Sequence, residues 1–446
     1  MTWQRVTALE WRRTGGPLLL VALALTGTVL FASRQRPFST WSSWSSTVAS
    51  ALEVVSSHGI VLGPVVATAA AWVAGRERRR RMGDLLASTA RPSWQRRLAT
   101  SGAVTAALLA GWLAQTAAVV GGVYPSVSYW GGRWWATLLL LALGTVLCAA
   151  IGSAVGRWVP GRLAPPALGI ALYVASAFPL YSGSRWAQMV PFAPLGVFDG
   201  QQLAAAVVPL AAAWAVCLVV LVGVVAIGGR RHWRVAAAVT AVALACGVAL
   251  QVLPHHTADL RSQAGSVQYS WVVPDPGATA LVCTDDAPVV CVQRVHASLL
   301  PEVTTVARQQ LQVVGRYLPV DRAEELDWGV TPASGVLPLI NLSGLGRPYR
   351  AGWDEQNAQQ WADTNLSSLT NFFCPGMEQR FPAWAITVSD TAQRLLGQPA
   401  FAEDERGAAL ATRLEADPEQ ARAWMTAFVP ASRSCDEAEL ERLAAW

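Results

Sequence analysis

Residues 75–97 read GRERRRRMGDLLASTARPSWQRR, and they form the most basic stretch of the chain. The stretch contains eight arginines, whereas Glu77 and Asp84 are its only acids. Apolar runs flank it on both sides, IVLGPVVATAAAWVA before it and LATSGAVTAALLAGWLAQTAAVV after it. A basic segment between two long apolar runs is typical of a connection between two membrane-spanning helices.

Composition extends this interpretation to half of the chain. Of the 446 residues, 53% are hydrophobic and 14% are charged, whereas soluble domains carry about 25% charged residues. Residues 1–254 have a net charge of +15 and residues 255–446 one of −10, which add to the +5 of the whole chain. This division predicts two domains in two different environments.

Seven stretches are long and apolar enough to span a bilayer, which takes about 20 residues. They are residues 16–33, 56–75, 98–122, 134–156, 163–181, 203–228 and 235–253. Polar residues 56–58 weaken the start of the second stretch. The fifth contains Pro165, Pro166 and Pro179, so we expect a broken or short helix there.

The distribution of arginine predicts the orientation of these spans. With a cytosolic N-terminus, sixteen arginines lie in the inner segments and four in the outer loops, as the positive-inside rule requires. Tryptophans near span ends, such as Trp72 and Trp158, suit an interfacial aromatic belt. Seven spans then place residues 255–446 outside the cytosol of a bacterial cell.

Cysteine usage agrees with that topology. Cys283, Cys291, Cys374 and Cys435 all lie in the acidic domain, and an even number in an oxidising compartment favours two disulfides. We expect Cys283–Cys291, because these residues flank a predicted hairpin turn, and Cys374–Cys435. The remaining cysteines fall within predicted spans and are expected to be free thiols: Cys148, Cys217 and Cys246.

The basic segment has a pattern beyond its charge. Asp84, Leu85 and Leu86 form a short amphipathic unit, Pro92 ends it, and Ser93 can cap the helix that follows. A short amphipathic helix between two spans has the geometry of a docking element.

In these residues the chain resembles the permease subunits of ABC transporters of the type 2 export class. The matching positions are Arg76, Glu77, Arg78, Gly83, Asp84, Leu85, Leu86, Ser88, Thr89, Pro92 and Ser93. The resemblance covers roughly residues 1–230. It implies that this loop is a coupling helix that docks on a separate ATPase subunit, and that residues 1–15 form an interfacial helix on the cytosolic side. The chain departs from the family in its unbroken Arg78–Arg81 run and in a seventh span that leads to an outer domain; that domain resembles those of uncharacterised actinobacterial permeases.

Residues 255–446 are predicted to be α+β, with a hairpin around residues 284–288 and helices near 354–373, 377–397, 401–414, 417–429 and 434–445. The candidate metal ligands are His255, His256 and Asp259, and His296 is expected to be structural. Asn341 and Asn365 begin short glycosylation sequons. We identify no catalytic constellation, and predict neither an enzyme nor a bound metal or cofactor.

The sequence therefore predicts a mainly α protein, a polytopic transmembrane helix bundle followed by a small α+β extracytoplasmic domain. The expected domains are an interfacial helix at 1–15, a six-span permease-like domain at 16–230, a seventh span at 231–254 and an outer domain at 255–446.

We expect an ABC exporter permease in the cell membrane, in contact with lipid, an ATPase subunit and a second permease chain, either identical or a sister permease, and with no nucleic acid. A P-loop needs a lysine, and the chain has none. The alternatives are a membrane-anchored binding or sensor protein and an ion-coupled secondary transporter.

Overall fold

The computed structural model describes residues 11–12, 15–34, 47–80, 92–124, 127–159, 161–182, 189–190, 195–197, 200–227, 233–252, 271–326, 333–340, 342, 355–370, 382–398 and 404–446. The chain divides into two compact units, Met1–Ala278 and Thr279–Trp446. Residues 1–10 of the expected interfacial helix lie outside the described residues.

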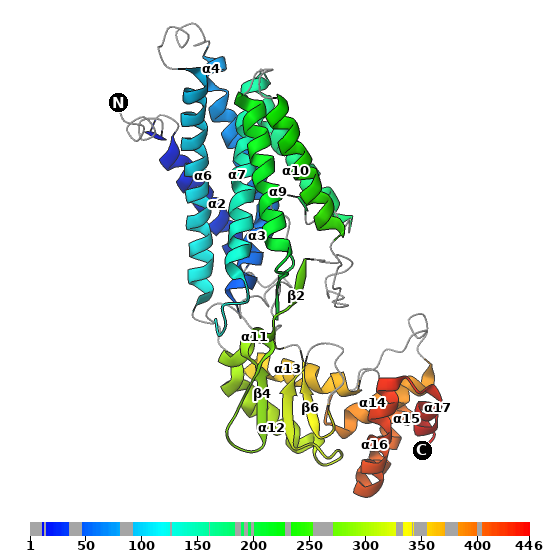
Figure 1. The fold of residues 1–446 in the computed structure, drawn as a ribbon. Helices are drawn as coiled ribbons and strands as arrows, with labels where there is room; N and C mark the ends of the chain where they lie inside the picture. The colour runs from blue at the N-terminus through cyan, green and yellow to red at the C-terminus, as the bar shows by residue number, and fades with distance from the viewer. Residues whose placement is uncertain are drawn as a thin grey trace. The chain divides into compact units, whose positions relative to one another are not determined.

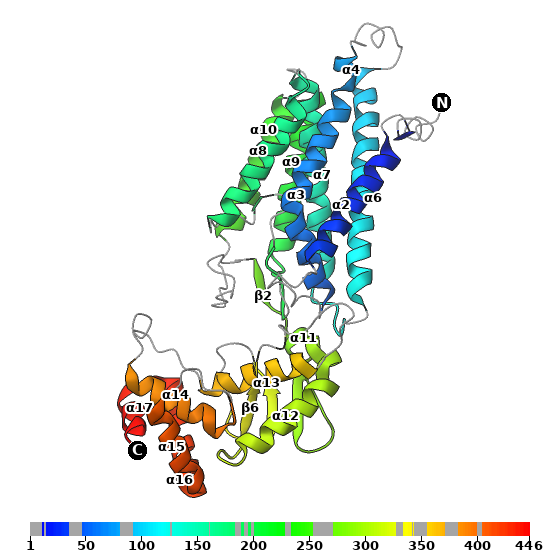
Figure 2. The same ribbon diagram turned by 180° about the vertical axis from the view of Figure 1, so that it is seen from behind.

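The first unit is a bundle of long helices that lie side by side and alternate in direction (Figures 1 and 2). The helices are α2 (Gly16–Arg34), α3 (Val48–Ala74), α6 (Ser93–Val123), α7 (Trp134–Trp158), α8 (Ala164–Tyr181), α9 (Val207–Ile227) and α10 (Trp233–Val252). Within the described residues, the six helices from α3 to α10 are long and apolar enough to cross a membrane. The first expected span corresponds to α2, whose apolar stretch Gly16–Gly27 is shorter. A multi-pass membrane protein is thus supported, and the expected count of seven spans depends on α2.

Helix α3 begins eight residues before the predicted start at residue 56. Its N-cap is Thr47, whose hydroxyl accepts a hydrogen bond from Ser50 N at 2.9 Å. The prediction was wrong because polar residues lowered the hydropathy of this stretch, yet Ser56 and His58 are buried among the other helices. As a consequence, Glu53 lies within α3, a helix long and apolar enough to cross a membrane.

Helix α8 is continuous, so the expected break is absent, but with 18 residues it is the shortest of the six candidate spans, as the alternative expectation of a short helix has it. Pro165 and Pro166 fall in its first turn, where backbone N–H groups have no intrahelical acceptor and proline is tolerated. Pro179 lies two residues before the last helical residue, Tyr181. Pro179 therefore lies inside the helix but in its last turn, and the helix continues past it to Tyr181.

Small residues bring α3 and α7 into close contact. A β-carbon at Gly152 would overlap the carbonyl group of Ala67, and one at Gly156 would overlap that of Ala71. The two glycines are one turn apart on α7, which is the small-xxx-small spacing that lets membrane helices approach closely. Helix α3 thereby packs tightly along the middle of the bundle.

A small sheet closes one end of the bundle. Strand β1 (Gln201–Leu203) precedes α9 and pairs antiparallel with β2 (Val272–Pro274), which follows α10. Trp271 and Val272 are buried in the same apolar cluster as Leu203. The second unit therefore begins at Thr279, not at the expected residue 255, because β2 belongs to the sheet of the first unit.

The second unit combines helices with a small four-stranded sheet. Its strands are β3 (Leu281–Cys283), β4 (Val289–Gln293), β5 (Arg322–Glu325) and β6 (Val336–Leu339), hydrogen-bonded in that order. The expected hairpin is the antiparallel pair β3–β4, whereas β4, β5 and β6 are parallel. After a 3₁₀ turn, Arg294–Leu299, helix α12 (Leu300–Val314) makes the crossover between β4 and β5. The short helix α11 (Pro276–Thr279) joins β2 to β3.

After β6, the described residues of the second unit form five helices near the expected positions. They are α13 (Glu355–Thr370), α14 (Ala383–Leu395), α15 (Glu405–Ala416), α16 (Pro418–Ser434) and α17 (Glu437–Ala444). Aspartates 404, 417 and 436 cap the last three helices by accepting backbone N–H bonds. Trp424 and Phe428 stack at 5.1 Å between ring centroids in the common apolar core.

Candidate functional site at the arginine-rich end of the helix bundle

The turns of the bundle differ in charge between its two ends. One end holds the start of α2, the α3–α6 connection, the α7–α8 turn and the start of α10; it includes the short helix α4 (Arg76–Arg79) (Figure 1). Its described arginines are Arg12, Arg76, Arg78, Arg79, Arg80, Arg96, Arg97, Arg157, Arg162 and Arg234, and its described acid is Glu77. At the opposite end the described arginines are Arg34 and Arg133, with Glu53 and Asp275 as acids. The structure thus gathers the arginines at one end, as the sequence predicts.

Arginine side chains tie the helix ends together there. Arg78 donates from Nη1 to the carbonyl oxygen of Trp158 at 3.1 Å, which links α4 to the end of α7. Arg157 donates to the carbonyl oxygen of Arg97 at 2.8 Å and also to the Ser101 hydroxyl, which links α7 to α6. The last carbonyl groups of a helix lack intrahelical donors and carry partial negative charge. At the end of α7 the Arg78 guanidinium supplies both a hydrogen-bond donor and a positive charge.

Arg79, the last residue of α4, turns back onto the end of α3. It donates to the carbonyl oxygen of Trp72 near the end of α3, and its guanidinium lies over the Trp72 ring, 4.3 Å from the centroid. Burial lowers the pKa of Arg79, and the positive charges of Arg162 and Arg80 lower it further. Positive charges that repel one another are therefore held together at this corner.

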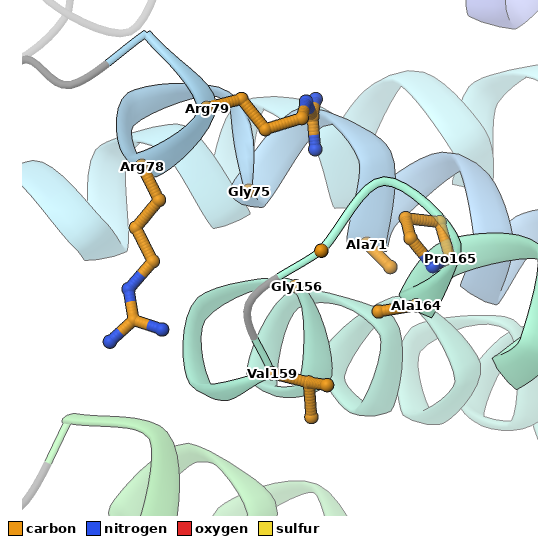
Figure 3. Close-up of a pocket in the computed structure, with 9 residues that line it drawn as sticks. Ala71, Gly75, Arg78, Arg79, Gly156, Val159, Ala164 and Pro165 are labelled. Carbon is orange, nitrogen blue, oxygen red and sulfur yellow. The ribbon is translucent and has the colours of Figure 1, made fainter.

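A small pocket opens between the α3–α4 turn and the α7–α8 turn (Figure 3). Its volume is about 20 Å³, which is enough for one water-sized group. It is lined by Ala71, Gly75, Arg78, Arg79, Gly156, Val159, Gly161, Ala164 and Pro165. Glycine is needed at its wall, because a β-carbon on Gly75 would lie 2.9 Å from the carbonyl oxygen of Gly156.

The structure places part of the predicted coupling segment. Arg76, Glu77 and Arg78 belong to α4, which follows α3 after Gly75. Pro92 is the N-cap of α6, with no side-chain cap hydrogen bond, and Ser93 is the first helical residue. The expectation that Ser93 caps this helix was therefore wrong by one position. The remaining predicted positions lie outside the described residues: Gly83, Asp84, Leu85, Leu86, Ser88 and Thr89.

The opposite end of the bundle contains polar residues that sequence analysis did not single out. The buried Glu53 carboxylate accepts hydrogen bonds from Leu195 N at 3.1 Å and Gly196 N at 2.9 Å. Buried Asp275 accepts one from Gly132 N at 2.6 Å and one from Gly277 N at 3.0 Å. A lone acid at the edge of an apolar run was the available signal for Glu53, but its partners are 142 residues away.

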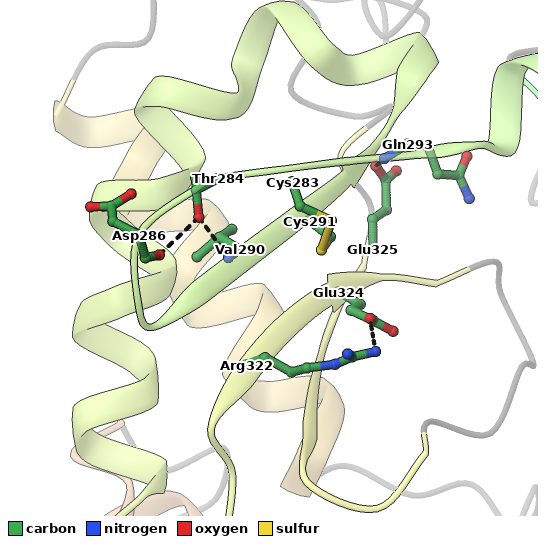
Figure 4. Close-up of a disulfide and its surroundings, with 9 residues drawn as sticks. All are labelled: Cys283, Thr284, Asp286, Val290, Cys291, Gln293, Arg322, Glu324 and Glu325. Carbon is green, nitrogen blue, oxygen red and sulfur yellow. Dashed lines mark hydrogen bonds and ion pairs between the residues drawn. A yellow bond between two sulfur atoms is a disulfide. The ribbon is translucent and has the colours of Figure 1, made fainter.

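In the second unit, Cys283 and Cys291 face each other across β3 and β4 and form a disulfide (Figure 4). This confirms the first expected pair. Cys435 is also disulfide-bonded, and its expected partner Cys374 lies outside the described residues. The expected free thiols are confirmed at the three positions within spans, Cys148, Cys217 and Cys246.

The other polar candidates of the second unit have structural partners. His296 Nδ1 lies 2.7 Å from Glu325 Oε1, with both side chains buried. Asn365 is fully buried and accepts a hydrogen bond from Ile340 N at 2.8 Å, so it is inaccessible to glycosylation. His255, His256, Asp259 and Asn341 lie outside the described residues. Within the residues that the structure describes, no group of three or more metal-ligating side chains occurs.

Comparison with protein-family models, curated proteins and solved structures yields no match for this chain.

Proposed function

We propose that this chain is the membrane-embedded permease subunit of an ABC-type exporter, driven by a separate ATPase subunit. The observation that carries the proposal is the connection between α3 and α6. At the arginine-rich end, α7 and α8 are joined by residues 159–163 and α9 and α10 by residues 228–232, whereas α3 and α6 are joined by residues 75–92. This long connection is the segment that can extend from the bundle to a partner.

Two features would transmit motion of that segment into the bundle. Helix α4 is separated from α3 only by Gly75, and Arg78 of α4 donates to the end of α7. Displacement of the connection would therefore act on α3 and α7 together. Because α3 and α7 are in close contact along Ala67 and Gly152, they would respond as one body.

We further propose that two permease chains form the transport path and that the second unit lies outside the cytosol. Helices α8, α9 and α10 expose large apolar side chains, among them Ile170, Val216 and Leu244. Such faces suit lipid and a second membrane chain. An outer location suits the acidic balance of residues 255–446 and the Cys283–Cys291 disulfide.

The proposal is tested by replacing Leu85 and Leu86 together with aspartate and measuring co-purification of the ATPase encoded beside this chain. Charged side chains on an apolar docking face would be costly to desolvate, so we expect at least a tenfold loss, about 1.4 kcal/mol. Leu163→Asp is the matched control, because Leu163 is exposed in the short α7–α8 turn at the same end. Normal membrane insertion with unchanged co-purification would contradict the coupling role.

Glu53 favours a second candidate function, an ion-coupled transporter, because ionisable residues within spans often mark ion pathways. Both of its carboxylate oxygens, however, accept backbone hydrogen bonds, which suits a structural role. In proteoliposomes, substrate uptake that follows an imposed proton gradient without ATPase, and is abolished in Glu53→Gln, would favour this candidate. A third possibility, a sensor or anchor, is weakened by the number of apolar helices, since one or two spans suffice to anchor a domain.

A further inference from the structure

The corner formed by the α3–α4 and α7–α8 turns concentrates positive charge. Arg78, Arg79 and Arg80 come from the first turn and Arg162 from the second. Gly161, the neighbour of Arg162, lines the same pocket as Arg78 and Arg79, and the charges of Arg162 and Arg80 lower the pKa of Arg79. Glu77 is the one acid that the structure describes at this end of the bundle. Bringing like charges together costs free energy unless an anion joins them.

The guanidinium groups retain donors for such an anion. Arg78 uses Nη1 on the carbonyl oxygen of Trp158, and Arg79 uses Nη2 on that of Trp72. Each guanidinium has five N–H donors in a planar fork, so each has others that can engage phosphate oxygens. The pocket beside Arg78 and Arg79 admits only a water-sized group, which fits one phosphate oxygen but not a whole phosphate.

The same corner carries exposed apolar side chains. Trp72 and Trp158 are 51% and 57% exposed, and both lie in the last turns of membrane-spanning helices. Beside them Val159 is 47% exposed and Leu163 79% exposed. Exposed tryptophans mark the level of lipid headgroups, and exposed aliphatic side chains next to them can contact acyl chains.

We propose that this corner binds the headgroup of an anionic phospholipid, with Arg79 and Arg162 on the phosphate and one phosphate oxygen in the Gly75–Gly156 pocket. The phosphate of a lipid would contact the cluster of guanidinium groups, and its acyl chains would contact the exposed apolar side chains beside them. A free phosphate would contact only the guanidinium groups. The site requires only that this end of the bundle lies at a membrane surface, and it is independent of ATPase docking.

The test uses the purified full-length chain in neutral detergent, titrated with palmitoyl-oleoyl phosphatidylglycerol and followed by native mass spectrometry of retained lipid. A basic side chain near a lipid headgroup contributes about 1 kcal/mol. We therefore expect about a fivefold loss of affinity for Arg162→Gln and about a thirtyfold loss for Arg79→Gln with Arg162→Gln. Because Arg162 is exposed, the single variant also provides a test that does not disturb packing.

Arg234→Gln is the matched control, since it removes one charge at the same end but away from the pocket lining; its affinity should stay within about twofold. Phosphatidylcholine with the same acyl chains should bind far more weakly. Equal losses for Arg162→Gln and Arg234→Gln would overturn the site in favour of diffuse charge attraction. Displacement of the lipid by inorganic phosphate at the same concentration would overturn the lipid in favour of a free anion.

Discussion

At the scale of single residues, Glu53 stabilises the end of the bundle opposite to the arginines. Its carboxylate holds Leu195 and Gly196 by their backbone N–H groups, and it is only 6% exposed. In Glu53→Ala both donors would lose their acceptor in a buried site, at about 1–3 kcal/mol for each. We expect a loss of about 3 kcal/mol in unfolding free energy, seen as a lower midpoint of thermal unfolding in detergent.

Glu53→Gln should be intermediate, because its amide has one accepting oxygen in place of two. Glu77→Ala removes a half-buried acid from the short helix α4 and should lower the midpoint less. Equal midpoints for Glu53→Ala and Glu77→Ala would contradict the assigned role.

The partners of some residues could be predicted from the sequence, and those of others could not. Cys283 and Cys291 could be paired in advance, because a short hairpin turn brings them opposite each other. The partners of Glu53, and Gly132 as a partner of Asp275, could not be predicted, because they lie more than a hundred residues away and are set by the packing of several helices. Contacts between neighbouring residues can be predicted from the local sequence, whereas long-range hydrogen bonds depend on the completed fold.

At the scale of elements, the contact between α3 and α7 determines how closely the bundle packs. Gly152→Val and Gly156→Val would each force a side chain against the backbone of α3. Overpacking of this kind typically costs 1–3 kcal/mol, and we expect about 2 kcal/mol or more here because the opposing atoms are backbone carbonyl groups. Gly223→Val in α9 is the matched control, since its β-carbon would meet nothing within 4 Å. The measurement is the midpoint of thermal unfolding, and similar values for all three variants would contradict the close contact.

The sequence predicted helices and strands correctly where the buried residues are apolar. Long apolar runs gave α6, α7, α9 and α10, and turn residues gave the β3–β4 hairpin. The start of α3 was missed because its polar residues are buried between helices, and hydropathy cannot separate that case from an exposed loop. The residues of the predicted coupling segment could be named from a motif, but the arginine bonds to the ends of α3 and α7 required the folded bundle.

At the scale of the whole molecule, the proposed topology predicts which segments are accessible from outside the cell. Protease added to intact spheroplasts should cleave within residues 255–446 and leave residues 75–97 uncut. After permeabilisation both regions should be cleaved. The reverse pattern in intact spheroplasts would mean that the bundle is inserted in the opposite orientation, because five candidate spans, α6 to α10, separate the two regions in either case.

The same topology predicts the state of the cysteines. In protein isolated with its thiols trapped, peptide mapping without reductant should find Cys283–Cys291 and Cys374–Cys435 bridged, because an extracytoplasmic compartment is oxidising. The cysteines inside α7, α9 and α10 should be alkylated as free thiols. Four alkylated thiols in residues 279–446 would place the second unit in the cytosol.

The pairing of β1 with β2 would hold the protein together if the chain were cut between them. The segment Trp271–Ala278 is held in the first unit by the β-ladder, by buried Trp271 and by the hydrogen bonds of Asp275. A single cut between residues 253 and 270 would therefore give two fragments that stay associated, and the carboxyl-terminal fragment would be retained without a peptide bond. The two fragments could therefore be expressed separately and would recombine by pairing of β1 with β2.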